Sequence, residues 1–163
     1  MRRLSRTRLI FTGLFATFFA IYLFIGLQPA DAYENYEISG SLSIPAISLT
    51  TDVTTSTING HRLSVPSRIV GSFSRFPNRT LLVGHSSSVF NHLHETKIGD
   101  AIYYNGANYQ ITSVNTLEKS AIDMDELLIP DTDTDTIILM TCAGTLFDNG
   151  DATHRLIVTA KRS

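Results

Sequence analysis

The sequence predicts an all-β domain, a closed or nearly closed barrel of about eight short strands, preceded by one N-terminal transmembrane helix. Three observations lead to this fold class. Short apolar or alternating runs recur along residues 37–163, and turn-forming residues separate them. Few of these runs are long enough for a helix. One uncharged stretch near the N-terminus, residues 9–27, is long enough to cross a bilayer.

Length and composition limit the class of protein. The 163 residues leave room for one extracytoplasmic domain beside the membrane segment. A hydrophobic content of 43% with 17% charged residues excludes a disordered or fibrous chain. The formal net charge of −2 provides no overall field that would attract nucleic acid. A single cysteine cannot form an intrachain disulfide, so the domain must be held by its core.

The N-terminal region has the charge pattern of a membrane anchor. Residues 1–8 contain four arginines and no acid, and residues 9–27 contain no charge at all. A helix over residues 9–27 would be about 28 Å long, close to the hydrocarbon thickness of a bilayer. Basic residues before the span predict a cytoplasmic N-terminus. Residues 28–36 then form a linker, and residues 37–163 form a domain outside the cell membrane.

A cleaved signal peptide is the alternative for this region. Ala30-Asp31-Ala32 resembles a small-x-small cleavage site. The apolar core of a signal peptide is about 7 to 15 residues long, shorter than residues 9–27. We favour the uncleaved anchor for that reason, and with either outcome the domain works outside the cytoplasm.

The first half of the domain contains short strands and breaks. Residues 36–49 alternate loosely, and Pro45 predicts a break between two strands there. Asn59-Gly60 predicts a tight turn. Residues 62–79 contain two prolines and a glycine and suggest an irregular segment suited to covering a cleft. Residues 80–84 form an apolar strand that ends directly at His85.

The middle of the domain contains the strongest hairpin signal. Residues 100–104 and 107–114 alternate on either side of Asn105-Gly106, a pair that favours a two-residue hairpin turn. Ser86 to Ser88 offer an N-cap for a short helix through Leu93. Residues 124–128 predict a single helical turn or an extended loop.

Two further strands surround the one cysteine. Residues 137–140 form a short aliphatic run that predicts a core strand, and residues 154–160 predict a second strand. If the two pair antiparallel, Cys142 at the end of the first and Arg155 at the start of the second face one site. An inert cysteine is the alternative, since free cysteines are often buried. The neighbouring glycine and arginine favour an exposed thiolate instead.

Three polar side chains at strand ends suggest nucleophilic chemistry: His85, Cys142 and Arg155. A cysteine nucleophile needs an acid for the leaving amine and positive charge where an oxyanion develops. A histidine and an arginine supply these functions. Pairing of a thiolate with an imidazolium predicts a bell-shaped dependence of activity on pH.

The sequences around these residues resemble a known family. Thr80-Leu-Leu-Val-Gly-His85, Ile138-Leu-Met-Thr-Cys142 and Arg155-Leu-Ile-Val resemble the His, TLxTC and Arg signatures of the sortases, a family of cysteine transpeptidases. Ile44-Pro-Ala-Ile-Ser-Leu49 and Ile98-Gly-Asp100 resemble two further segments of that family. Ile138 replaces the first Thr of TLxTC and precedes Cys142 by four residues, on the cysteine's face of the strand. We expect an effect on packing or on a substrate wall rather than on the chemistry.

The resemblance implies a fold, an activity and partners. It implies a closed sortase-like barrel that cleaves a C-terminal sorting signal of the LPxTG type on a secreted protein. Cys142 would form a thioacyl intermediate, His85 would act as acid and base, and Arg155 would hold the carbonyl oxygen. An amine of a peptidoglycan precursor or a lysine of a pilin subunit would accept the acyl group. Candidates for substrate contact are three neighbours of the cysteine: Ile138, Thr141 and Ala143.

Cofactors and other functions remain as alternatives. No cofactor is expected, and Asp131, Asp133 and Asp135 only weakly suggest calcium, because the glycine turn and closing glutamate of a calcium loop are missing. His92 and His94 are two residues apart and make poor metal ligands. A peptide-binding barrel without chemistry and a secreted cysteine hydrolase are the alternatives to a transpeptidase.

Overall fold

The computed structural model describes residues 36–59, 62–130, 133–148 and 151–163. These lie in the compact unit Tyr36–Ser163. The predicted transmembrane helix and its basic flank, residues 1–27, fall outside the described residues, as does most of the predicted linker. Within the described ranges no helix is long and apolar enough to cross a bilayer.

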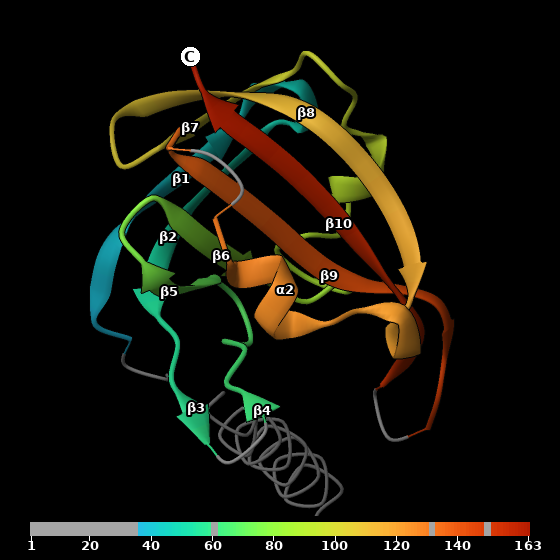
Figure 1. Cartoon of the computed structure of the whole chain (residues 1–163). Helices are drawn as coiled ribbons and strands as arrows, with labels where there is room; N and C mark the ends of the chain where they lie inside the picture. The colour runs from blue at the N-terminus through green and yellow to red at the C-terminus, as the bar shows by residue number, and fades with distance from the viewer. Residues whose placement is uncertain (1–35, 60–61, 131–132, 149–150) are drawn as a thin grey trace, which may run out of the picture. The chain divides into compact units, whose positions relative to one another are not determined.

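Eight strands close into a barrel, as the sequence predicts (Figure 1). Neighbouring strands follow the order β1-β2-β5-β6-β9-β10-β8-β7, and β7 pairs with β1 to complete the circle. The pairs β2/β5 and β6/β9 are parallel. The strands are β1 (Ile38–Ile44), β2 (Leu49–Thr55), β5 (Val70–Phe76), β6 (Arg79–Val83), β7 (Ala101–Tyr104), β8 (Ala107–Glu118), β9 (Thr136–Leu146) and β10 (Ala152–Arg162).

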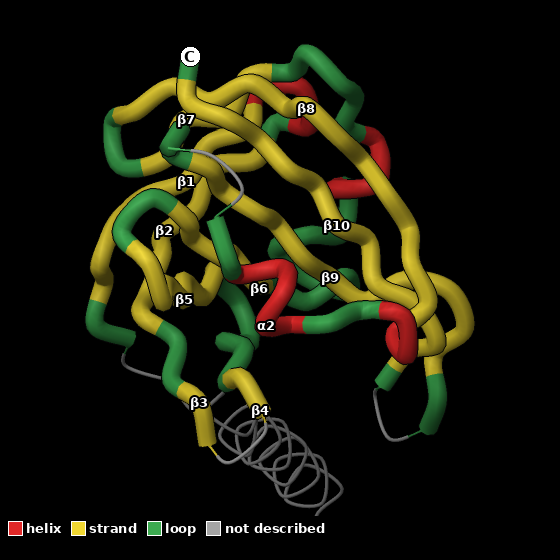
Figure 2. Tube along the Cα trace, in the orientation of Figure 1, coloured by secondary structure: helices red, strands yellow, loops and turns green. Residues whose placement is uncertain are grey.

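Helical structure is sparse in the described residues (Figure 2). The α-helix α2 (Met124–Leu128) is capped at its N-terminus by Asp123, whose carboxylate accepts hydrogen bonds from the amides of Asp125 and Glu126. Three short 3-10 turns cover Pro45–Ile47, Leu93–Glu95 and Lys119–Ala121. The turn at Pro45–Ile47 separates β1 from β2, so the predicted break at the proline is confirmed.

Local signals predicted the hairpins well. Asn105 and Gly106 have φ angles of 48° and 78° and connect β7 to β8, as the two-residue turn requires. Two minor strands, β3 (Ile58–Asn59) and β4 (Arg62–Leu63), pair antiparallel beside the turn predicted at Asn59-Gly60. Residues 60–61 lie outside the described ranges.

Three local predictions were wrong. Cys142 does not end its strand, because β9 continues to Leu146 with β10 as its partner. Residues 62–79 are not one irregular segment, since they contain β4 and the barrel strand β5, which pairs with both β2 and β6. The chain after Ser86 forms turns and the 3-10 turn Leu93–Glu95 rather than an α-helix, with no side-chain cap at the start of that turn.

Two apolar clusters hold the barrel. The larger fills the interior and takes residues from most of the strands, including Leu42, Leu82 and Leu139. The smaller lies on the outer wall, where Leu128 of α2 packs with apolar side chains of β6, β9 and β10. Figure 1 shows α2 lying across β6 and β9. The buried members of the outer cluster are Leu81, Val83, Leu128, Ile138 and Ile157.

Candidate active site

A cleft of about 600 Å³ opens on the outer wall of the barrel. Its lining includes all three residues that the sequence suggested for chemistry, His85, Cys142 and Arg155. They come from three neighbouring parts of the sheet: the segment after β6, the middle of β9 and the start of β10. Residues 57 and 13 positions away from Cys142 in the sequence therefore line the same cleft as the cysteine.

Cys142 lies where β9 loses one of its two neighbouring strands. The parallel ladder between β6 and β9 ends at the pair Val83 and Met140, while β9 continues for six residues along β10. Alternate side chains of a strand share a face, so Cys142 projects on the outer side with Met140 and Ile138. The thiol is free and half-buried. A nucleophile at this position is supported by the sheet and reachable from solvent.

His85 is held at the level of the cysteine by the residue before it. The Gly84 amide donates a hydrogen bond to the Met140 carbonyl (3.4 Å), and the Thr141 hydroxyl donates one to the Gly84 carbonyl (2.8 Å). A Cβ at Gly84 would lie 2.6 Å from Val89, so glycine permits this close approach. His85 itself is exposed, which leaves its ring accessible to a substrate.

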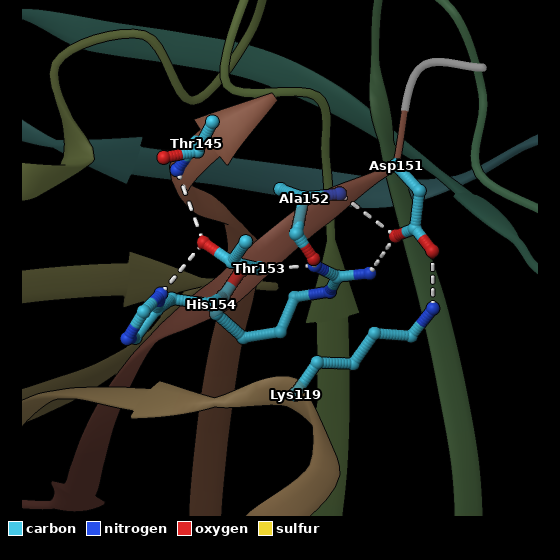
Figure 3. Close-up of polar contacts among 7 residues, drawn as sticks. Lys119, Thr145, Asp151, Ala152, Thr153 and His154 are labelled. Carbon is cyan, nitrogen blue, oxygen red and sulfur yellow. Dashed lines mark hydrogen bonds and ion pairs between the residues drawn. The ribbon is translucent and has the colours of Figure 1, made fainter. Parts of the chain in front are cut away.

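Arg155 lies directly opposite Cys142 in the antiparallel ladder between β9 and β10. Its side chain is 15% exposed. Nη1 donates hydrogen bonds to the carbonyls of Ala152 (3.0 Å) and His154 (2.9 Å), and Nη2 donates one to Asp151 Oδ1 (2.7 Å). The dashed lines of Figure 3 follow these contacts at the start of β10. The guanidinium is therefore fixed against its own strand.

Asp151 pairs with a second cation, Lys119, as well as with Arg155. Its carboxylate accepts hydrogen bonds from Lys119, from Arg155 and from the Ala152 amide (Figure 3). The bond from Lys119, followed by that from Arg155, holds the pKa of Asp151 well below its usual range. The carboxylate thus stays ionised. Asp151 and Lys119 both line the cleft, and sequence reasoning gave neither a role.

A second, apolar cleft of about 670 Å³ adjoins the first. The two share four lining residues: Leu63, Lys119, Met140 and Arg155. The floor of the second cleft is the outer cluster, with Leu81 and Met140 below and Leu128 of α2 at the side. The sequence signal for Met140 was its position two residues before Cys142, on the same face.

The candidates for substrate contact lie in different surroundings. Ile138 is completely buried in the outer cluster and lines neither cleft. Thr141 lines the catalytic cleft, but its hydroxyl is used to hold Gly84. Ala143 packs against the interior cluster. Ile138 therefore affects packing, the first of the two effects expected for it.

The remaining histidines and acids lie in other surroundings. His92 Nδ1 is 2.7 Å from Glu95 Oε1, and His154 Nδ1 is 2.8 Å from the Thr153 hydroxyl. Asp135 pairs with Arg162 at 2.7 Å. Across the described ranges no group of three or more His, Cys, Asp or Glu side chains is arranged to hold a metal ion. Asp131 lies outside those ranges.

Comparison with protein families decides the relationship. A sequence model of the sortase domain matches residues 42–163 of the chain. The chain belongs to the sortase family. The resemblance suggested by the sequence is therefore confirmed, and the match includes His85, Cys142 and Arg155.

Solved sortase structures share the barrel. Sortase A from Corynebacterium diphtheriae is 25% identical with a TM-score of 0.59, and the match covers 78% of this chain and 61% of that one. Sortase C-3 from Streptococcus pneumoniae is 22% identical with a TM-score of 0.59, covering 81% of this chain and 65% of that one. Listeria monocytogenes sortase A is 19% identical with a TM-score of 0.58, covering 77% and 87%. Comparison with the curated proteins gives no match.

The chain matches only 61% of the length of the Corynebacterium sortase A and 65% of the length of the Streptococcus sortase C-3. Both A-type and C-type sortases are similar to it, so the likeness supports the family and the fold rather than one subclass.

Proposed function

We propose that this protein is a membrane-anchored cysteine transpeptidase that cleaves a C-terminal sorting signal of the LPxTG type and transfers the protein to an amine. The observation that carries the proposal is the meeting of His85, Cys142 and Arg155 in one cleft. A nucleophile, an acid and a cation at one place are what acyl transfer through a thioester requires.

The first half-reaction forms the thioester. The Cys142 sulfur attacks the carbonyl carbon of the Thr-Gly bond of the signal, and the carbonyl oxygen becomes an oxyanion. Arg155 stabilises that oxyanion with charge-assisted hydrogen bonds. His85 donates a proton to the departing glycine nitrogen, and the C–N bond breaks. The upstream part of the substrate stays bound to the sulfur.

The second half-reaction releases the upstream part of the substrate from the sulfur. His85 removes a proton from the incoming amine, whose nitrogen attacks the thioester carbon, and the C–S bond breaks. A lysine of a pilin subunit and an amine of a peptidoglycan precursor are the acceptors that family resemblance suggests.

The apolar cleft supports a sorting signal as substrate. Apolar side chains of β5, β6, β9 and α2 form most of its lining, which suits the Leu-Pro part of such a signal in an extended conformation, and Arg75 and Asp125 in the lining pair with each other. The charged residues at its margin include Arg155 and Lys119, next to the catalytic cleft. The scissile bond would then lie at the cysteine while the apolar residues occupy the groove.

The test is a peptide ligation assay with the full-length chain in detergent. A fluorogenic LPxTG-type peptide is incubated with and without an amine acceptor, using wild type and Cys142→Ala. We expect amine-dependent ligated product from wild type and none from the variant. Cleavage that ignores the amine would identify a hydrolase instead. Peptide binding without turnover that survives Cys142→Ala would identify a binding module.

Anchoring is tested separately by intact mass. We propose that residues 9–27 remain in the mature protein, because the uncharged run is longer than a signal peptide core. Membrane-fraction protein should then retain residues 1–8 and be released only by detergent. A mature form that begins near residue 33 would contradict the anchor and indicate cleavage after Ala32.

A further inference from the structure

We propose that Asp151 is the positioning residue for Arg155: its carboxylate holds the guanidinium at the level of Cys142 and leaves donors for the substrate oxyanion. This inference rests on the proposed function of the cleft. It starts from the contact between Arg155 Nη2 and Asp151 Oδ1 at 2.7 Å.

The number of donors supports positioning. A guanidinium has five N–H groups. The contacts to Ala152, His154 and Asp151 use three of them, two on Nη1 and one on Nη2. Within the described part of the chain the other two, on Nη2 and Nε, have no partner. Arg155 is therefore held on one side and retains two donors in a residue that lines the cleft.

Charge supports the same role. Asp151 is the only carboxylate among the described residues lining the catalytic cleft. It faces two cations, Lys119 and Arg155, so the three groups together keep a charge of +1. The carboxylate can thus hold Arg155 without removing the positive charge that a thiolate and an oxyanion need. Its lowered pKa, caused by the same two bonds, keeps it charged.

The place of Asp151 in the fold explains how it acts. It precedes β10 and is fixed by the Ala152 amide, which donates to Oδ1 at 2.9 Å. The same oxygen receives Arg155 Nη2, so one atom connects the start of the strand to the guanidinium. Lys119, at the end of β8, holds the other oxygen. Figure 3 shows Lys119 and Asp151 directed toward each other between two strand ends.

A double-mutant cycle tests the role. The variants are Asp151→Asn, Arg155→Ala and the double variant, with Asp148→Asn as the control, since Asp148 is an exposed carboxylate of the same loop. In thioacyl formation we expect kcat to fall by about 10²- to 10³-fold for Arg155→Ala. Asp151→Asn should lower kcat on the order of tenfold with little change in KM. The double variant should match Arg155→Ala alone, because Asp151 acts through Arg155.

Other outcomes overturn the proposal. Independent losses that multiply in the double variant would show that Asp151 acts elsewhere. A rate for Asp151→Asn equal to wild type, or higher, would show that the contact is neutral or withholds Arg155 from substrate.

A second measurement does not depend on activity. Nitrogen-15 relaxation of the Arg155 guanidinium should show an ordered group in wild type and Asp148→Asn, and a mobile one in Asp151→Asn. An equally ordered group in all three proteins would overturn the proposal even if no ligation were detected. The two experiments can also disagree. If wild type does not ligate but the guanidinium becomes mobile only in Asp151→Asn, the proposed function is contradicted and the positioning contact is still supported.

Discussion

The two halves of β9 share one strand but have opposite surroundings. Residues 136–139 are all buried, with β6 on one side and β10 on the other. Residues 142–146 are half-buried to exposed, and only β10 accompanies them. The first half contributes packing, and the second half, beginning at Cys142, contains the proposed nucleophile.

The difference teaches where this barrel has room for chemistry. A strand that pairs with neighbours on both edges is held by hydrogen bonds and packing on both sides. A strand that extends beyond one of its neighbours is still paired along one edge, while the other edge is free for a substrate to approach. Cys142 follows the last β6 pair by two residues. A substitution in the first half should therefore lower stability, and one around the second half should lower activity.

The largest loss of activity is expected from His85→Ala, which changes the cleft that contains Cys142. The rate of peptide cleavage should fall by about 10²- to 10⁴-fold, because the leaving amine loses its acid. The melting temperature should stay close to that of wild type, since His85 is exposed. The measurement is steady-state cleavage of the sorting peptide, with His92→Ala as an exposed control. Equal rates for the two variants would remove His85 from the site.

Leu139→Ala should produce the largest loss of stability. Leu139 is completely buried in the interior cluster, so a cavity replaces it and the free energy of unfolding should fall by about 2–5 kcal/mol. Leu146→Ala is the matched control in the other half of the same strand, where the leucine is 61% exposed. It should change the free energy by less than about 0.5 kcal/mol in urea unfolding. Similar losses for both leucines would erase the distinction between the halves.

Thr141→Val tests the junction between the halves. The valine keeps the shape of threonine but leaves the Gly84 carbonyl without the buried hydroxyl, which should cost about 1–3 kcal/mol of unfolding free energy. Activity should also fall, because this bond fixes the residue before His85. Thr141→Ser keeps the hydroxyl and should retain most of the activity. Full activity in Thr141→Val, with a loss only in Thr141→Ser, would assign the role of Thr141 to its methyl group instead.

The smallest effect is expected in acid. The pKa of Asp151 is lowered by folding, so its bonds stabilise the protein above the ordinary carboxyl range, and the stabilisation is lost as pH falls through the lowered value. The difference in Tm between wild type and Asp151→Asn should be present at about pH 6 and shrink toward about pH 2. The shift should be small, because the Asp151 side chain is 34% exposed and solvent screens its ion pairs. A Tm difference that increased as the pH fell would contradict the direction of the Asp151 pKa shift.

Local features of the fold could be predicted from the sequence. Asn105-Gly106 determines its own turn geometry, and Pro45 breaks its own strand, so neither depends on distant residues. The end of β9 could not be predicted in this way. Gly144 has a φ of 75° inside the strand, at an irregularity in the pairing with β10. A Cβ there would lie 2.5 Å from the Thr153 hydroxyl, so the partner strand explains the glycine.

The members of the candidate site could be chosen from the sequence, but their arrangement could not. His85, Cys142 and Arg155 were chosen for their chemistry and their positions near strands, and the cleft contains all three. Asp151 was missed because its position four residues before Arg155 has no meaning until the strand start is known. Lys119 lies 32 residues away from Asp151 along the chain, and only the pairing of β8 with β10 brings it near.

The parallel pairing of β6 and β9 also has a consequence for how the protein folds. The two strands are separated by more than fifty residues, and β1 must wait for β7 to close the ring. Such distant pairings form slowly, since chain entropy is lost before contacts compensate for it. We therefore expect His85 and Cys142 to come together late in folding. A newly made chain should carry an unreactive thiol until its last strands have docked.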